Sequence, residues 1–199
     1  MRYIYPSLSI DCFECNPTKV DFMKLVNAVL KERHLKKFLW YIRLVRSFNK
    51  QPDCIDLDEA YNIFACQLIQ ESITIDSVTF KFHINATLAN ELAKQYNPVD
   101  VSMRSFVTRD EERGGTLYEP PDKTPTYEHR ISSIPIVAIP HFQPQYPLWV
   151  VDGNHRITAK KGADFDTVSM VALPINDVWQ LFATDFERLL WLFLTKYYT

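Results

Sequence analysis

The chain has 199 residues, 47% of them hydrophobic and 23% charged, so it is long enough and apolar enough to bury a core. Its formal net charge of -2 argues against attachment to DNA or lipid through bulk positive charge. No run approaches the roughly 18 apolar residues of a membrane helix, and the start M-R-Y-I-Y-P-S-L lacks the apolar core of a signal peptide. We therefore expect a cytoplasmic protein with no membrane partner.

Residues 18–75 have the pattern of helices. Apolar residues recur at i, i+3 and i+4 between Phe22 and Leu30 and again between Leu35 and Ile42. Asp58 then opens a third expected helix that runs to about Glu71. The sequence therefore predicts a helical N-terminal region over 1–76.

Cysteines in this region form one close pair, Cys12 and Cys15, in a C-x-x-C arrangement. Such a pair can be half of a zinc site or a redox motif. The other two, Cys54 and Cys66, are twelve residues apart, a spacing that fits no common zinc module. Reduced structural cysteines are the simpler interpretation, and the role of Cys12 and Cys15 stays open.

The segment 31–50 is basic, with seven Lys or Arg residues against the single acid Glu32, and with Trp40 and Tyr41 interleaved. Basic and aromatic residues together are typical of a nucleic-acid-binding face. An amphipathic helix with a basic polar side gives the same pattern, because Lys and Arg are ordinary helix formers. Nucleic acid is therefore an alternative partner.

Further along, the alternation V-T-F-K-F-H-I over 78–84 predicts a strand, and Thr87 begins an expected helix over 88–96 that Asn97-Pro98 ends. From 99 to 173 the pattern is one of strands and proline-containing loops. Large apolar residues over 178–198 predict a closing helix rich in aromatic side chains.

The loop from Arg104 to Lys123 concentrates charge around the pair Gly114-Gly115. Such a loop is either a lid that supplies an arginine to a ligand, with Arg104 as the candidate, or a mobile solvated loop. His129-Arg130 follow closely enough to reach the same ligand. For His83 and His141 we expect a surface position or a capped position in the core.

The most informative stretch is V-V-D-G-N-H-R-I-T-A-K at 150–160, which begins with the last two residues of the apolar segment 148–151. It predicts a strand, a turn at Asp152-Gly153 and a helix from Asn154 to about Lys161, with Gly162 as its C-terminal stop. A helix start after a glycine turn directs free backbone N–H groups at one point, where an anion such as phosphate is favoured.

His155 and Arg156 lie in the expected first turn, where the helix dipole disfavours a cation by roughly 0.3–1 kcal/mol. A bound phosphate would offset this cost, and so would a carboxylate from elsewhere in the fold. In the plainer interpretation Asp152 is an ordinary N-cap and Gly153 an ordinary turn residue.

This stretch and its neighbours resemble the ParB/sulfiredoxin superfamily. The resemblance rests on I-P-I-V-A-I at 134–139, the strand and turn ending D-G-N-H-R, the helix R-I-T-A with Gly162, and the apolar segment 168–173. It covers about 40 of the 199 residues. In this superfamily the signature turn holds nucleotide phosphates, and its members include nucleotide hydrolases, sulfinic-acid reductases, a free-serine kinase branch and proteins described as nucleases.

Two departures narrow what the resemblance implies. Asn154 stands where the sulfiredoxin branch needs a cysteine, so sulfinic-acid reduction is not expected. The partition branch carries G-E-R-R and a helix-turn-helix domain after it, and the residues 174–199 are too few for such a domain. The Asp-before-Gly variant is closest to the small-molecule kinase branch and to branches without a known function.

The resemblance implies a nucleotide di- or triphosphate held by Gly153, Asn154, His155, Arg156 and the more distant Arg104. Asp152 would ligate Mg²⁺ or accept a proton from an incoming hydroxyl, which makes Asp152 and His155 the candidate catalytic residues. We expect phosphate binding, with nucleotide hydrolysis or phosphoryl transfer as the reaction if the protein is an enzyme.

The expected fold is α+β, in which the helical region 1–76 packs on a small mixed β-sheet domain of the ParB/sulfiredoxin type over 77–199, closed by the aromatic-rich helix. The two regions could also form one continuous domain. A nucleic-acid-binding or nuclease-like module using 31–50 is the first functional alternative, and a non-catalytic protein-interaction domain is the second. The base, the phosphate acceptor and the oligomeric state are not predicted.

Overall fold

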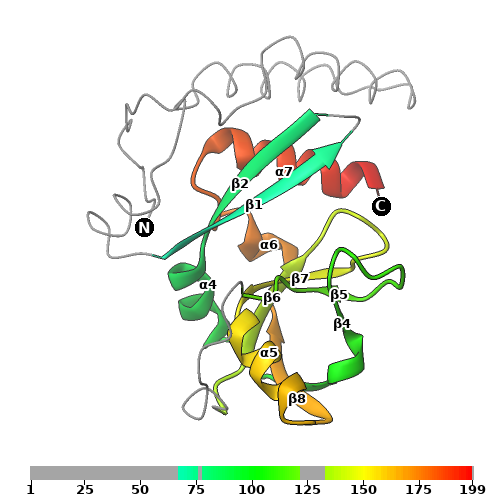
Figure 1. Cartoon of the computed structure of the whole chain (residues 1–199). Helices are drawn as coiled ribbons and strands as arrows, with labels where there is room; N and C mark the ends of the chain where they lie inside the picture. The colour runs from blue at the N-terminus through cyan, green and yellow to red at the C-terminus, as the bar shows by residue number, and fades with distance from the viewer. Residues whose placement is uncertain (1–66, 76–77, 122–132, 199) are drawn as a thin grey trace. The chain divides into compact units, whose positions relative to one another are not determined.

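The computed structural model describes residues 67–75, 78–121 and 133–198 (Figure 1). These residues form helices and a mixed β-sheet, which confirms the α+β class. The predicted helices before residue 67 and the basic segment 31–50 lie outside the described residues. Among the described helices, none is both long enough and apolar enough to span a bilayer.

The chain divides into two compact units, Met1–Asn85 with Phe182–Leu190, and Ala86–Leu181 with Trp191–Thr199. In the first unit, β1 (Leu68–Ile75) and β2 (Val78–Asn85) form an antiparallel hairpin in which Leu68 pairs with Asn85 and Ile75 with Val78 (Figure 1). The strand predicted at 78–84 is confirmed, but the helical prediction for 68–75 is wrong. The segment L-I-Q-E-S-I-T-I pairs along its whole length with β2, and this pairing overrides a weak helical pattern.

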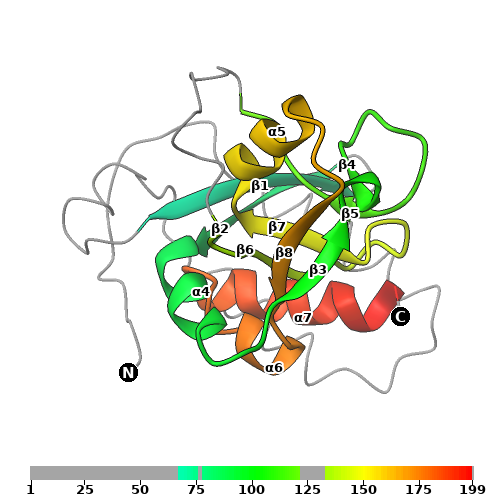
Figure 2. The same ribbon diagram turned by 90° about the horizontal axis from the view of Figure 1, so that it is seen from below.

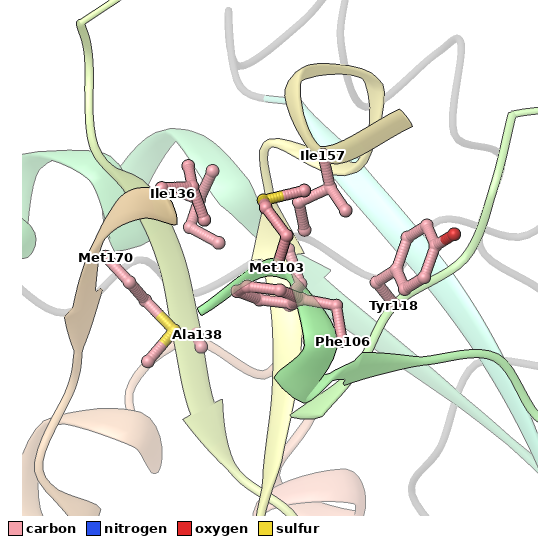
Figure 3. Close-up of a cluster of buried hydrophobic side chains, with 9 residues drawn as sticks. Met103, Phe106, Tyr118, Ile136, Ala138, Ile157 and Met170 are labelled. Atoms are coloured by element: carbon pink, nitrogen blue, oxygen red, sulfur yellow. The ribbon is translucent and has the colours of Figure 1, made fainter. Parts of the chain in front are cut away.

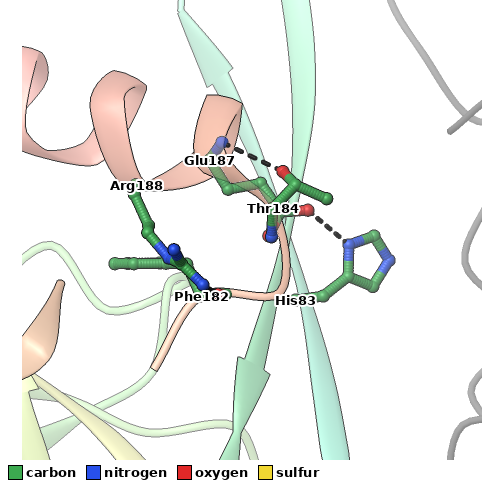
Figure 4. A network of polar contacts seen from close by, with 5 residues as sticks. All are labelled: His83, Phe182, Thr184, Glu187 and Arg188. Atoms are coloured by element: carbon green, nitrogen blue, oxygen red, sulfur yellow. Dashed lines mark hydrogen bonds and ion pairs between the residues drawn. The ribbon is translucent and has the colours of Figure 1, made fainter. Parts of the chain in front are cut away.

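The C-terminal segment of the first unit joins β2 through Phe182 and Ala183. Phe182 forms a β-bridge with Ile84, and the N–H of Ala183 donates to the carbonyl of His83 (2.9 Å). Glu187, which is buried, contacts the Nδ1 of His83 at 2.7 Å (Figure 4). These contacts attach the start of the last helix to the hairpin.

The closing helix predicted over 178–198 is confirmed only from Asp185, where α7 (Asp185–Tyr198) begins, and a separate short helix, α6 (Ile175–Val178), precedes it. A capping box separates them, because the N–H of Glu187 donates to the hydroxyl of Thr184 (3.1 Å) and the N–H of Thr184 donates to the carboxylate of Glu187 (3.4 Å; Figure 4). This reciprocal pair satisfies two N–H groups at the start of α7. The sequence T-D-F-E therefore begins a new helix rather than continuing one.

The second unit contains a six-stranded mixed sheet in the order β3-β8-β6-β7-β5-β4. Its strands are β3 (Val99–Ser102), β4 (Phe106–Val107), β5 (Thr116–Leu117), β6 (Ile136–Pro140), β7 (Leu148–Asp152) and β8 (Thr167–Ala172). β8 runs parallel to β6 and antiparallel to β3, and it lies between them (Figure 2). β6 and β7 are antiparallel neighbours at the centre of the sheet.

Helix α5 (Asn154–Gly162) connects β7 to β8 and covers one face of the sheet. Its Ile157 is fully buried and reaches toward Met103 and Phe106 (Figure 3). Ile136 and Ala138 of β6 belong to the same cluster, whose other members are Tyr118, Val150, Val168 and Met170. Because alternate residues of a strand point to opposite faces, the even positions of β6 and β7 form this core.

The opposite face of the same strands is also covered. Trp149 of β7 contacts Trp191, with ring centroids 5.8 Å apart. Ile139 of β6, which pairs with Trp149, is buried on this face too, and Val151 of β7 is also buried. Central strands buried on both faces explain why 136–139 and 149–151 are nearly continuous apolar runs.

Helix α4 (Ala86–Ala93) precedes β3, and it starts and ends a few residues before the predicted helix 88–96. Small residues make close packing possible, since Ala86, Ala89 and Ala93 are all buried. Beyond α4, the hydroxyl of Tyr96 donates to the carboxylate of Asp177 in α6. This hydrogen bond, with the coulombic effect of Asp177 and partial desolvation, raises the pKa of Tyr96.

Candidate functional site

The candidate site is the turn where β7 ends at Asp152 and α5 begins at Asn154. Gly153 joins them with φ 105° and ψ 11°, a left-handed conformation that L side chains rarely adopt. A Cβ at this position would lie 2.4 Å from the Cγ2 of Ile136, well inside contact distance. Glycine is therefore required here both by the backbone conformation and by the close approach of β6.

Gly153 is the N-cap of α5, and it has no side chain with which to cap the helix. The first helical hydrogen bond runs from the N–H of Ile157 to the carbonyl of Gly153 (3.0 Å). N–H groups earlier in a first turn have no carbonyl partner within the helix and point out of its end. The predicted geometry, a strand followed by a glycine turn and a helix start, is confirmed.

Arg156 is turned inward to Asp152 rather than outward to water. Its Nη2 donates to the carboxylate of Asp152 and to the carbonyl of Pro135 (3.3 Å). Only 16% of the Arg156 side chain and 25% of the Asp152 side chain are exposed. The carboxylate of Asp152, in the same turn, therefore supplies the negative charge that a cation in the first turn requires, whereas a bound phosphate or a carboxylate from elsewhere in the fold was expected.

One donor of this arginine stays unused, because the Nε of Arg156 is buried and has no hydrogen-bond partner among the described residues. Asp152, for its part, does not act as a free carboxylate at the helix start. Any role for Asp152 toward a metal or a substrate proton requires the pair with Arg156 to open.

Asn154 fixes the turn to a neighbouring segment. Its Oδ1 accepts a hydrogen bond from the N–H of Glu119 (3.3 Å), and the carboxylate of Glu119 accepts one from the Nε of Arg109 (2.9 Å). Glu119 and Arg109 thus belong to the surroundings of the turn, although no sequence pattern singled out Glu119. The side chain of Asn154 is a tether to this segment, whereas His155 beside it is exposed.

Arg104 does not lie at the turn. Together with Lys161 and Asp164 it lines a depression at the C-terminal end of α5, the opposite end of the helix from Gly153. A nine-residue helix is about 13 Å long, so its two ends form separate environments. The expectation that Arg104 contributes to the same phosphate as Arg156 is not supported by this placement.

The charged loop after Arg104 is held by specific contacts. The N–H of Gly115 donates to the carbonyl of Gln145 (2.9 Å), and the carboxylate of Glu111 accepts from the N–H of Thr108 (3.0 Å) and the Nε of Arg113 (2.8 Å). The hydrogen bond from Thr108, assisted by Arg113, lowers the pKa of Glu111. These contacts favour neither a hinged lid nor a loose solvated loop.

The C-terminal end of α5 differs from the prediction. Gly162 is the last helical residue, and the left-handed residue is Asp164 with φ 54°. The N–H of Phe165 donates to the carbonyl of Lys160 (3.1 Å) and the N–H of Asp164 to that of Lys161 (3.3 Å). This is the Schellman pattern, so the helix ends two residues later than a glycine stop would place it.

His141 occupies a core position, one of the two expected for it. Its Nδ1 accepts from the N–H of Gln143 (3.1 Å), so a neutral ring carries its proton on Nε2, which is buried without a hydrogen-bond partner among the described residues. Burial, with a smaller contribution from the charge of Arg109, lowers the pKa of His141 to about 3. Aromatic rings surround it: Phe142, Tyr146, Trp149 and Trp191.

The described residues contain no group of three or more His, Cys, Asp or Glu side chains arranged to hold a metal ion. The four cysteines and the pair His129-Arg130 lie outside the described ranges. Their predicted roles therefore stay predictions.

Comparison with known proteins identified no similar protein. No protein-family model matches the chain, and no curated protein or solved structure matches it significantly.

Proposed function

We propose that the protein is a ParB/sulfiredoxin-like protein that binds a nucleotide phosphate at the start of α5. The observation that carries the proposal is the N-cap at Gly153, which leaves the end of a nine-residue helix without a side-chain cap. Helix N-termini favour anions because the N–H groups and the helix dipole act together. The order β6, β7, α5, β8 matches the order of elements that the resemblance implies, which supports the proposal.

The charge pair at this turn affects how a phosphate would bind. The Arg156 guanidinium is already paired with Asp152, so an incoming phosphate competes with a carboxylate for it. Opening the pair gives a forked contact from the guanidinium to the phosphate. The exposed His155 is the other side chain of the first turn that we assign to the ligand.

Most of the ligands of a Mg²⁺ ion at this site would come from the nucleotide phosphates and water rather than from the protein. Among the described residues the turn offers one carboxylate, that of Asp152, and Mg²⁺ is commonly held by one or two carboxylates together with substrate phosphates and water. Phosphate hydrolysis or transfer belongs to the same proposal, with Asp152 and His155 as the candidate catalytic residues.

The test is isothermal titration of the full chain with nucleoside mono-, di- and triphosphates, with and without Mg²⁺. Arg156→Ala should weaken nucleotide binding at least tenfold, the effect of losing one charge-assisted contact. Lys94→Ala is the matched control, since it removes an exposed cation just after the end of α4. Absence of binding to the wild-type chain, or equal binding by both variants, would contradict the proposal.

The nucleic-acid alternative rests on the basic segment 31–50, which lies outside the described residues, and it stays a prediction. A steep salt dependence of binding to duplex DNA would favour it.

A further inference from the structure

A second candidate site lies at the other end of α5, in an open depression of about 570 Å³. Its volume falls within the range of small-molecule sites. Three segments of the second unit line it: the end of β3 with the short 3₁₀ turn Met103–Ser105, the loop residue Arg113, and the residues from Lys161 to Thr167. It lies about one α5 length from Gly153 and is independent of the proposed phosphate turn.

Two arginines line this depression and have N–H donors that are not used within the described residues. Arg104 is exposed, and its guanidinium has no hydrogen-bond or ion-pair partner among the described residues. Within the part of the chain that the structure describes, Arg113 is held only through its Nε, which donates to Glu111, so its two terminal nitrogens stay available. Glu111 is itself fixed by the N–H of Thr108, which orients Arg113 in advance of any ligand.

The backbone that presents Arg104 is also fixed. The hydroxyl of Ser102 accepts from the N–H of Arg104 (3.3 Å), and the N–H of Met103 donates to the carbonyl of Asp166 (2.8 Å). Buried Met103 also belongs to the lining of the depression. Pre-oriented donors lose less conformational entropy when they bind a ligand.

Lys161, by contrast, already has two contacts within the protein. Its Nζ donates to the carbonyl of Phe106 (3.0 Å) and lies 4.5 Å from the ring centre of Tyr118. We therefore assign to it a contribution of positive charge to the depression. The contacts to an anion would therefore come from Arg104 and Arg113.

The lining also contains two carboxylates, Asp164 and Asp166, both on exposed residues. An ionised carboxylate only accepts hydrogen bonds and repels a bare anion. A ligand that satisfies both kinds of side chain needs an oxyanion for the arginines and hydrogen-bond donors for the carboxylates. Two guanidinium groups favour a phosphate, which they recognise by forked contacts.

We propose that this depression binds a small phosphate ester that carries hydroxyl groups, with its phosphate on Arg104 and Arg113 and a hydroxyl on Asp166. A sugar phosphate has this chemistry. Inorganic phosphate has only the anionic part, and the free sugar has only the hydroxyl groups. Comparing the affinities of the three compounds therefore separates the contribution of the two arginines from that of Asp166.

The experiment titrates the full chain with ribose 5-phosphate, inorganic phosphate and ribose. Ribose 5-phosphate should bind most tightly, and Arg104→Gln and Arg113→Gln should each weaken its binding at least tenfold. Arg109→Gln is the matched control, because Arg109 pairs with Glu119 as Arg113 pairs with Glu111 but does not line the depression.

Asp166→Ala should change the affinities for two of the compounds in opposite directions. It should weaken ribose 5-phosphate binding, because a hydroxyl acceptor is lost, and should tighten inorganic phosphate, because a repelling charge is removed. The proposal is overturned if the wild-type chain binds none of the three compounds, if it binds inorganic phosphate as tightly as the ester, or if Arg104→Gln changes nothing. Melting temperatures of the variants check that each one is folded.

Discussion

The carboxylate of Asp152 accepts a hydrogen bond from the Nη2 of Arg156, so the last residue of β7 neutralises an arginine in the first turn of α5. A charge pair of this kind holds strand and helix together across the glycine between them. It also keeps the guanidinium in one orientation beside the helix start. The pair therefore affects both the stability of the turn and its affinity for anions.

Asp152→Asn should separate these two effects. Loss of the partly buried partner should lower the free energy of unfolding by about 1–2 kcal/mol. The freed guanidinium should bind phosphate more tightly than in the wild-type chain, as the proposed function requires. Urea denaturation and phosphate titration measure the two quantities, with the exposed Asp110→Asn as the control. A variant that is destabilised but gains no affinity would show that Arg156 has only a structural role.

Two glycines of the same region should respond to alanine in opposite directions. Gly153→Ala should lower the free energy of unfolding by about 2–4 kcal/mol, because φ 105° is strained for alanine and the Cβ would meet Ile136. Gly162→Ala should raise it by about 0.5–1 kcal/mol, since Gly162 is helical and a Cβ there would meet nothing within 4 Å. Chemical denaturation of both variants provides the comparison. Equal effects would contradict the backbone described for this turn.

The end of α5 offers a third test, at Asp164. Asp164→Gly should raise the free energy of unfolding by about 0.5–1 kcal/mol, because glycine adopts φ 54° without steric cost. Asp164→Ala keeps a Cβ in the same conformation and should give no gain. Thermal melts should show the difference as a few degrees. A gain of stability in both variants would point to removal of charge rather than relief of the backbone.

His141 should make the protein sensitive to acid. Its pKa is lowered by burial from an ordinary value of 6.5 to about 3, so the unfolded chain takes up a proton at this residue over a pH range in which the folded chain does not. The stability associated with neutral His141 is therefore complete above pH 6.5 and is lost as the pH falls toward 3, by as much as about 4 kcal/mol.

The measurement is the slope of unfolding free energy against pH between 6.5 and 4. His141→Asn keeps an acceptor for the N–H of Gln143 but does not titrate, so its slope should be smaller than that of the wild-type chain. His155→Asn, at an exposed position, is the control. An unchanged slope in His141→Asn would mean that other groups dominate acid unfolding.

The sequence predicted the turn well because its signals are local. An apolar strand, Asp152-Gly153 and a helix start follow one another within ten residues, and each acts through its own backbone preference. The start of α7 was missed although its signal was equally local, since Thr184 and Glu187 form a capping box. A long run of large apolar residues concealed it.

Other features depend on contacts with a second segment of the chain, near or distant, and the sequence of the segment itself did not reveal them. β1 is a strand because β2 pairs with it residue by residue. Arg104 precedes the turn in the chain but lines the opposite end of α5, because β3 pairs with β8 and brings the following residues to that end. Glu119 reaches Asn154 through a backbone N–H, which any residue type could provide.

The order of strands has a consequence for synthesis on the ribosome. β3 has a single neighbour in the six-stranded sheet, and this neighbour is β8, whose residues are translated much later. While the chain grows, β6 and β7 can pair as soon as both have emerged, but β3 has to wait for β8. The nascent sheet should therefore assemble outward from β6 and β7 and incorporate its earliest strand last.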